Sequence, residues 1–254
     1  MFDPPVAMAS LSGASDADWA RTGAPWVGAA FLGGIAICEA TRDAARQLVD
    51  RDREEFLPSD PVAFIDDELD KLDDVVVHPG VNVRAVDREA IPPMATVCAR
   101  HDAIYEVNAH CRQDELCAVG AGESLLADTD RLAEQVTIAG EAGATVSAKV
   151  RTEVPDVDLV ETAIAIENAG ASAIHVDAMD SEHRIADIVD RTSLFVIANN
   201  GVRGPRSVAE YLDYGADAVS VGRPSDRPVV LEQVYRAVQA YEPTREVLPT
   251  SNDR

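Results

Sequence analysis

Short apolar stretches alternate with helical patterns along almost the whole chain. Short apolar runs are typical of buried parallel strands, and longer runs with a period near 3.6 are typical of the helices that connect them. We expect strands at residues 6–10, 26–34, 81–85, 104–110, 145–151, 172–178, 194–200 and 217–223. We expect helices at residues 16–24, 39–53, 59–72, 90–101, 129–142, 158–169, 180–191, 205–214 and 228–241, with a further helical pattern beginning near residue 123.

This order predicts an α/β fold, a single-domain parallel (β/α)₈ barrel of the TIM type over residues 1–243. The active site of such a barrel lies at the C-terminal ends of the strands. No linker-like stretch divides the chain, and residues 244–254 are expected to form a flexible tail.

Several classes of protein are disfavoured by the sequence. No run of about 18 apolar residues occurs and no basic then apolar leader opens the chain, so we expect a cytoplasmic protein without membrane contact. The four cysteines are scattered, and Cys111 and Cys117 lack the close spacing of a zinc site. We therefore expect free thiols and no metal.

The net charge of −23 is the strongest anomaly of composition. Because the acidic residues are spread along the chain, we interpret them as an adaptation to concentrated salt, of the kind halophilic proteins show. A basic partner protein is the alternative. Such a surface repels polyanions at low salt.

Polar side chains gather where the expected strands end. On the strand at 104–110, Glu106 and Asn108 share one face while Tyr105 and Val107 share the other, and Cys111 follows directly. The residues that the barrel would bring to its mouth are Ser10, Asn82, Asn108, Cys111, Lys149, Arg151, His175, Asp177, Asn199, Gly201, Gly222 and Arg223. The mouth therefore resembles a site more than a core.

Lys149 is one of only two lysines in the chain and stands in the middle of an alternating strand. Burial of a lysine is costly unless an electron-rich group lies opposite. The two interpretations are an ion pair with Glu106 or Asp177 and a cation that faces a ligand. At the ends of the last two strands, residues 199–201 and 222–223 combine glycine with Arg223, which favours a phosphorylated cofactor.

Five ordered motifs resemble the tRNA-dihydrouridine synthases, FMN-dependent barrels that reduce uridine in tRNA. Residues 9–16 (ASLSGASD) resemble the opening segment of that family, and residues 108–112 (NAHCR) resemble its Asn-x-Gly-Cys-Pro motif. Residues 120–126 (GAGESLL) resemble Gly-Ala-Gly-x-x-Leu-Leu. Residues 149–151 match Lys-x-Arg, and residues 222–223 match the cofactor phosphate contact.

The resemblance implies FMN as cofactor, NAD(P)H as co-substrate and Cys111 as the acid that protonates C5 of uracil. The implied cofactor contacts are Ser10, Leu11, Ser12, Asn82, Lys149, Asn199, Asn200, Gly201, Gly222 and Arg223. The implied substrate contacts are Asn108, Arg151, His175 and Asp177. Cys117 is an alternative for the working thiol.

Three departures concern the substrate. Asp177 and Met179 stand where the family has His-x-Arg, and His110 replaces the motif glycine. We also expect the protein to lack the helical tRNA-binding domain of the family. The expected function is reduction of uridine in tRNA. The alternatives are a dihydroorotate or dihydropyrimidine dehydrogenase-like enzyme acting on a free pyrimidine, and a non-catalytic flavin-binding barrel.

Overall fold

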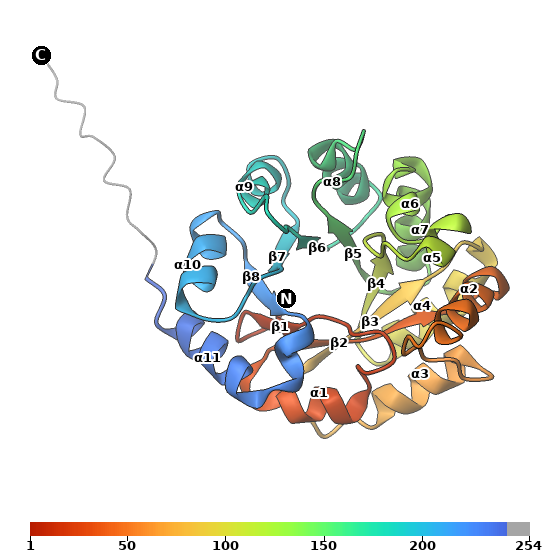
Figure 1. The fold of residues 1–254 in the computed structure, drawn as a ribbon, viewed down its shortest axis with the longest axis horizontal. Coiled ribbons are helices and arrows are strands. Elements are labelled where there is room, and N and C mark those ends of the chain that lie inside the picture. The colour runs from red at the N-terminus through yellow and green to blue at the C-terminus, as the bar shows by residue number, and fades with distance from the viewer. Residues whose placement is uncertain (243–254) are drawn as a thin grey trace, which may run out of the picture.

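The computed structural model describes residues 1–242 and confirms the expected barrel. Eight parallel strands close in sequence order into the inner ring, and the helices form the outer ring (Figure 1). The strands are β1 (Val6–Met8), β2 (Ala29–Ala36), β3 (His78–Arg84), β4 (Ile104–Asn108), β5 (Thr145–Arg151), β6 (Ala173–Asp177), β7 (Phe195–Asn199) and β8 (Ala218–Val221). The expected tail at 244–254 lies outside the described residues.

The outer ring combines α-helices with short 3₁₀ turns. The α-helices are α1 (Ala17–Gly23), α2 (Glu39–Val49), α3 (Pro61–Asp70), α4 (Ile91–Arg100), α5 (Asp114–Ala118), α6 (Glu123–Leu126), α7 (Thr129–Glu141), α8 (Leu159–Asn168), α9 (Arg184–Val189), α10 (Pro205–Asp213) and α11 (Pro228–Gln239). The 3₁₀ turns are η1 (Ala24–Trp26), η2 (Arg88–Ala90) and η3 (Arg223–Asp226). None of the described helices is long and apolar enough to cross a membrane.

Local chemistry sets where several helices begin. Asp60 accepts hydrogen bonds from the N–H groups of Val62 and Ala63 at 3.0 and 3.1 Å, and Pro61 occupies the first turn of α3. Asp158 caps α8 in the same way. These caps satisfy amide groups that have no partner inside the helix, so they fix the residues at which α3 and α8 begin.

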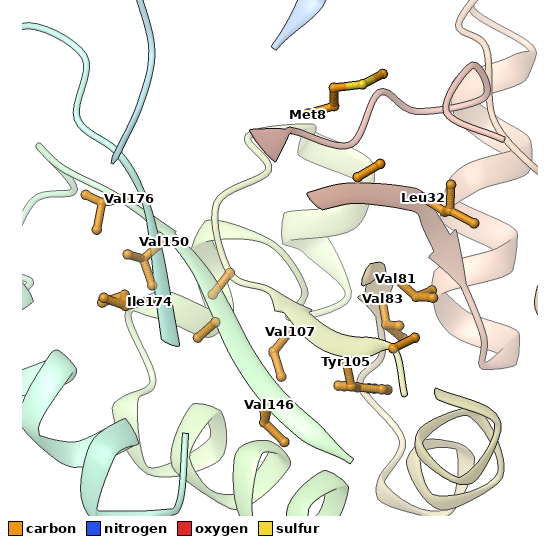
Figure 2. Packing of buried hydrophobic residues seen from close by; sticks show 14 of the residues in the cluster. Met8, Leu32, Val81, Val83, Tyr105, Val107, Val146, Val150, Ile174 and Val176 are labelled. Atoms are coloured by element: carbon orange, nitrogen blue, oxygen red, sulfur yellow. The ribbon is translucent and has the colours of Figure 1, made fainter. Parts of the chain in front are cut away.

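The apolar residues divide between the outside and the inside of the strand ring. Side chains on the outer face pack against the helices and form the main core; Tyr105, Val107 and Val146 on neighbouring strands are part of it (Figure 2). A smaller inner cluster closes the barrel and contains Ala7, Ala29, Phe31, Ile104, Ile197 and Ala218. The predicted alternation on β4 is thus confirmed, and polar residues fill the rest of the interior.

Three local expectations were wrong in detail. The strand expected at 26–34 begins at Ala29 and runs to Ala36, because Trp26 belongs to η1. The helix expected at 180–191 begins only at Arg184, since residues before it form turns and Ser181 donates a hydrogen bond to Glu153. The helix α5, which contains Cys117, was not predicted.

Candidate active site

Most of the predicted site residues converge at the carboxyl end of the barrel, but at different depths. Asn82 and His175 are fully buried in the barrel interior, together with Glu106 and Ser220. Asn108, Lys149, Arg151 and Asn199 lie at the mouth and keep slight exposure. The strand pattern predicts which face a side chain occupies, whereas depth depends on how far each strand extends.

A chain of hydrogen bonds begins at Asn108 and runs into the barrel. The Asn108 side-chain amide donates to Asn82 Oδ1 at 2.7 Å, and Asn82 Nδ2 donates to Glu106 Oε1 at 2.7 Å. All three side chains are buried, so each bond replaces lost hydration. Asn82 therefore lies one step below the mouth and orients Asn108.

His175 continues the chain on the other side of Glu106. Its Nδ1 lies 2.7 Å from Glu106 Oε2, and its Nε2 lies 2.7 Å from Ser220 Oγ. Asn199 Nδ2 donates to the same hydroxyl at 2.6 Å. Both ring nitrogens of His175 are thus engaged with protein groups, so its predicted contact with substrate has no free nitrogen in this conformation.

The protonation states of Glu106 and His175 follow from their surroundings. Burial opposes ionisation of Glu106, but His175, Lys149 and the hydrogen bond from Asn82 outweigh it and lower the pKa of the carboxyl group. Burial, followed by the charge of Lys149, lowers the pKa of His175. An ionised Glu106 and a neutral His175 satisfy the whole chain, because Nδ1–H then donates to the carboxylate and Nε2 accepts from Ser220.

Lys149 lies at the mouth beside this network and is 2% exposed. Burial lowers the pKa of its ammonium group, while the charges of Glu106 and Asp177 act in the opposite direction. Within residues 1–242, neither an ion pair nor a hydrogen bond to its Nζ is found. The ion pair with Glu106 or Asp177 that one interpretation required is not formed.

Cys111 follows β4 by three residues, and its backbone is held at both ends. Its N–H donates to Asn108 Oδ1 at 3.3 Å. Its carbonyl accepts from the N–H of Glu123 at 2.9 Å and from the thiol of Cys117 at 3.5 Å. The buried network thus fixes Cys111 through Asn108, while Cys117 lies on α5 and directs its own thiol toward the backbone.

The glycine motif after Cys111 has a steric reason. Gly122 has a φ of +60°, and a Cβ there would lie 2.2 Å from the carbonyl oxygen of Cys111. A side chain at position 122 would therefore displace the cysteine loop. The motif at residues 120–126 packs the start of α6 directly on Cys111.

Arg151 and Asp177 occupy the rim beyond Lys149. Arg151 is buried, and its guanidinium contacts Glu123 Oε2 at 3.4 Å and Met179 Sδ at 2.7 Å. Asp177 is half-buried and accepts a hydrogen bond from Asn200 Nδ2 at 2.7 Å. Met179 thus fills space beside Arg151, and Asp177 holds the loop that follows β7.

The sequence analysis missed a buried ion pair at the mouth. Arg84, at the end of β3, contacts Glu55 at 2.5 Å, and both side chains are 3% exposed. A second guanidinium nitrogen donates to Ser12 Oγ. The alternation of residues along β3 predicts that Arg84 shares the face of Asn82. The partner Glu55 could not be predicted, because it lies in a loop without a periodic sequence pattern. The pair joins that loop to the predicted cofactor segment at 10–12, whose residues are half-buried.

The ends of β7 and β8 offer open backbone. Asn200 and Gly201 have φ values of +93° and +66°, and the Tyr211 hydroxyl donates to the Asn200 carbonyl at 2.9 Å. No atom lies within 4 Å of the place where a Cβ would stand on Gly201 or Gly222. Arg223 is exposed directly beside Gly222. Such backbone with an adjacent guanidinium is suited to a phosphate group.

Comparison with known proteins identifies the family. The sequence model described as Dihydrouridine synthase (Dus) matches residues 92–251, more than half of the chain. The chain belongs to the dihydrouridine synthase family. The protein named Uncharacterized protein MJ0144, from Methanocaldococcus jannaschii, is 29% identical over 235 residues, covering 87% of this chain and 89% of that protein. The family supports an FMN-dependent oxidoreductase of the barrel type.

Solved structures share the fold at low sequence identity. FabK from Thermotoga maritima, in its M276A form, superposes with a TM-score of 0.57 at 15% identity and covers 87% of this chain. The present chain spans 61% of the FabK chain. A mandelate oxidase mutant with the C4a-OH-FMN adduct gives 0.59 at 15% identity, with 92% of this chain and 74% of that chain covered. The Amycolatopsis orientalis BexX/CysO complex gives 0.60 at 16% identity, with 94% and 89% covered.

The residues of the mouth fit a flavin mononucleotide. Lys149 is 2% exposed, and its ammonium group has no hydrogen bond in the described part of the chain, which suits an electron-rich ring edge. The open backbone at Gly201 and Gly222 and the exposed Arg223 suit the terminal phosphate. Asn82, predicted as a cofactor contact, is buried and hydrogen-bonds Glu106 and Asn108.

Proposed function

We propose that the protein reduces uridine to dihydrouridine in tRNA, with NAD(P)H as the electron donor and FMN as the cofactor. The observation that carries the proposal is the placement of Cys111. Its backbone is fixed by Asn108, Glu123 and Cys117, and Asn108 is paired in register with Lys149 on β5. This is a fixed thiol beside a cation that has no hydrogen-bond partner in residues 1–242.

The chemistry divides between the cofactor and the chain. FMN, which Lys149, Gly201, Gly222 and Arg223 would hold, would supply the hydride chemistry, with NAD(P)H as the source of electrons. Cys111 supplies the proton for C5, and a positioned general acid of this kind contributes about 10² to 10⁴ in rate. Asn108 keeps the thiol loop in place, and the chain from Asn82 to Ser220 keeps Asn108 in place.

Exposed arginines at the mouth support a phosphate-bearing substrate. Many of the other arginines pair with carboxylates, as Arg88 does with Glu134. Around the mouth, a group that we call the rim arginines forms no ion pair within the described residues: Arg112, Arg203, Arg206, Arg223 and Arg227. They follow β4, β7 and β8. In a chain with a net charge of −23, unpaired arginines on this face are suited to RNA phosphates.

The content of dihydrouridine in cellular tRNA tests the proposal. A strain without the gene is expected to lose dihydrouridine at one or more tRNA positions, and the wild-type gene is expected to restore it. The Cys111→Ala gene, expressed at equal level, is expected to fail. Unchanged dihydrouridine in the deletion strain would overturn the assignment to tRNA.

Reduction or oxidation of a free pyrimidine is the second candidate. It is favoured by Asp177 and Met179, which stand where the family has His-x-Arg and which here bind Asn200 and Arg151. A deletion strain with normal tRNA, combined with purified protein that converts uracil or dihydroorotate, would establish it. A protein that binds flavin but oxidises and reduces neither substrate would be the non-catalytic barrel.

A further inference from the structure

The ring of His110 has an unused hydrogen-bonding atom at the mouth. His110 lies between Asn108 and Cys111, and its Nδ1 is buried without a hydrogen-bond partner among the described residues. A buried polar nitrogen that stays unpaired costs about 1–3 kcal/mol. A ligand group that hydrogen-bonds this nitrogen would recover that cost.

The charges around His110 locate its ring. Lys149 and Arg151 on β5 and Arg84 on β3 all act on it electrostatically. Burial comes first and these groups follow, and together they hold the pKa of His110 well below its usual value. The ring is thus neutral, with one N–H group and one lone pair, and lies near the cations of β3 and β5.

The backbone of His110 is held in place. Its N–H lies 3.5 Å from Asn108 Oδ1, and Asn108 is itself held by Asn82 at 2.7 Å. The ring is therefore attached to the same fixed loop as Cys111. The resembling family motif has glycine at this position, so the imidazole is a feature of this chain.

The same surroundings restrict the group that the ring can bind. Three cations near the ring disfavour a cationic ligand and favour carbonyl oxygens. A neutral imidazole presents either a donor or an acceptor at Nδ1, and an imide edge, in which one N–H stands between two carbonyls, matches both. Uracil carries this edge, and so does the pyrimidine end of a flavin.

We infer that His110 is a specificity-determining residue whose Nδ1 hydrogen-bonds the imide edge of a pyrimidine ring bound in the mouth. The inference rests on the proposed function, since it assumes that such rings enter this site. The edge belongs either to the substrate or to the flavin. If it belongs to the substrate, the dissociation constant of the pyrimidine nucleotide depends on His110. If it belongs to the flavin, the dissociation constant of FMN does.

Equilibrium binding to three variants tests the inference. His110→Asn keeps a short group with a donor and an acceptor, His110→Leu keeps bulk without a hydrogen bond, and His110→Gly has the residue of the family motif. Dissociation constants are measured for FMN on the apoprotein, and for uridine 5′-monophosphate and its N3-methyl derivative on the oxidised flavoprotein. Thermal unfolding confirms that each variant is folded.

The two sources give different results. If the substrate edge is bound, the wild type prefers uridine 5′-monophosphate over its N3-methyl derivative by roughly 10-fold, and His110→Leu loses that preference while its affinity for FMN is unchanged. If the flavin edge is bound, the affinity for FMN falls roughly 10-fold in His110→Leu and recovers in His110→Asn.

Two outcomes overturn the inference. One is equal affinity of the wild type and His110→Leu for FMN and for uridine 5′-monophosphate. The other is a wild type that binds neither ring. Failure of the tRNA assignment appears separately, as unchanged dihydrouridine in the deletion strain, because the binding measurements require no turnover.

Discussion

A buried ammonium group without a hydrogen bond weakens a fold unless a ligand compensates for it. Lys149 is in this position within residues 1–242, so Lys149→Met should leave the apoprotein at least as stable as the wild type. Affinity for FMN should fall by about 10- to 100-fold, the loss expected for a hydrogen bond to a charged group. Thermal unfolding with and without FMN measures both effects.

The other lysine provides the control for this experiment. Lys71 is exposed and pairs with Glu68 on the outside of the barrel. Lys71→Met should therefore leave the affinity for FMN unchanged. Equal affinity in Lys149→Met and the wild type would show that the cation does not contact the cofactor.

Cys111 should act in only one half-reaction. Transfer of hydride from NAD(P)H to flavin needs no protein acid, whereas saturation of uracil needs a proton at C5. Cys111→Ala should therefore keep flavin reduction near the wild-type rate and slow reoxidation by substrate by about 10² to 10⁴. Stopped-flow absorbance of the flavin, with each substrate added separately, measures the two rates.

Cys117→Ala is the matched control, since Cys117 lies on α5 and donates to the Cys111 carbonyl. It should change both half-reactions little. The assignment of the acid fails if Cys117→Ala is the variant that loses reoxidation by substrate. It also fails if Cys111→Ala loses flavin reduction.

At the scale of elements, the short helix α6 is packed on the loop that carries Cys111. Gly122→Ala should cost about 1–3 kcal/mol, because its φ of +60° is unfavourable for alanine and the new Cβ would lie 2.2 Å from the Cys111 carbonyl oxygen. Reoxidation by substrate should slow as the thiol shifts. Urea unfolding and the stopped-flow assay report the two effects.

A second glycine separates this steric effect from helix propensity. Gly140 lies within α7, and no atom lies within 4 Å of its would-be Cβ. Gly140→Ala should raise stability by about 1 kcal/mol and leave both rates unchanged. Equal effects of the two substitutions would contradict the contact between α6 and Cys111.

The elements show what the sequence could predict. TVSAKVR alternates so regularly that β5 was predicted with its observed bounds, Thr145–Arg151. Alternation along β6 likewise predicted that His175 faces the barrel interior. It did not predict how deeply the side chain is buried, because a period of two residues does not specify the position of a strand along the barrel axis. The pair of Arg84 with Glu55 was missed, since it joins a strand to a loop without periodicity.

The sequence also predicted parts of the site for different physical reasons. Lys149 and Cys111 were visible because each breaks an apolar pattern. The close packing of Gly122 on the carbonyl of Cys111 could not be predicted, because the two residues meet only in the folded loop. The hydrogen bond between Asn82 and Asn108 was not visible either, because it joins two strands.

At the scale of the whole molecule, long-range repulsion competes with local contacts. The net charge of −23 opposes the approach of RNA, whereas the rim arginines are placed at the mouth itself. The Debye length falls from about 10 Å at 0.1 M salt to about 3 Å at 1 M. Salt therefore screens the distant acids more completely than arginine–phosphate contacts at short range.

This difference predicts an unusual salt dependence for tRNA binding. Affinity should persist or improve between about 0.1 and 1 M salt, whereas release of counterions normally weakens binding with a slope near −0.9 per phosphate contact. Filter binding at several salt concentrations measures the slope.

Arg203→Gln combined with Arg206→Gln should weaken binding at every concentration, while Arg46→Gln, on the outer helix α2, should not. An affinity that falls steeply with salt while the fold stays intact would mean that a concentrated basic surface, and not a few rim contacts, holds the RNA.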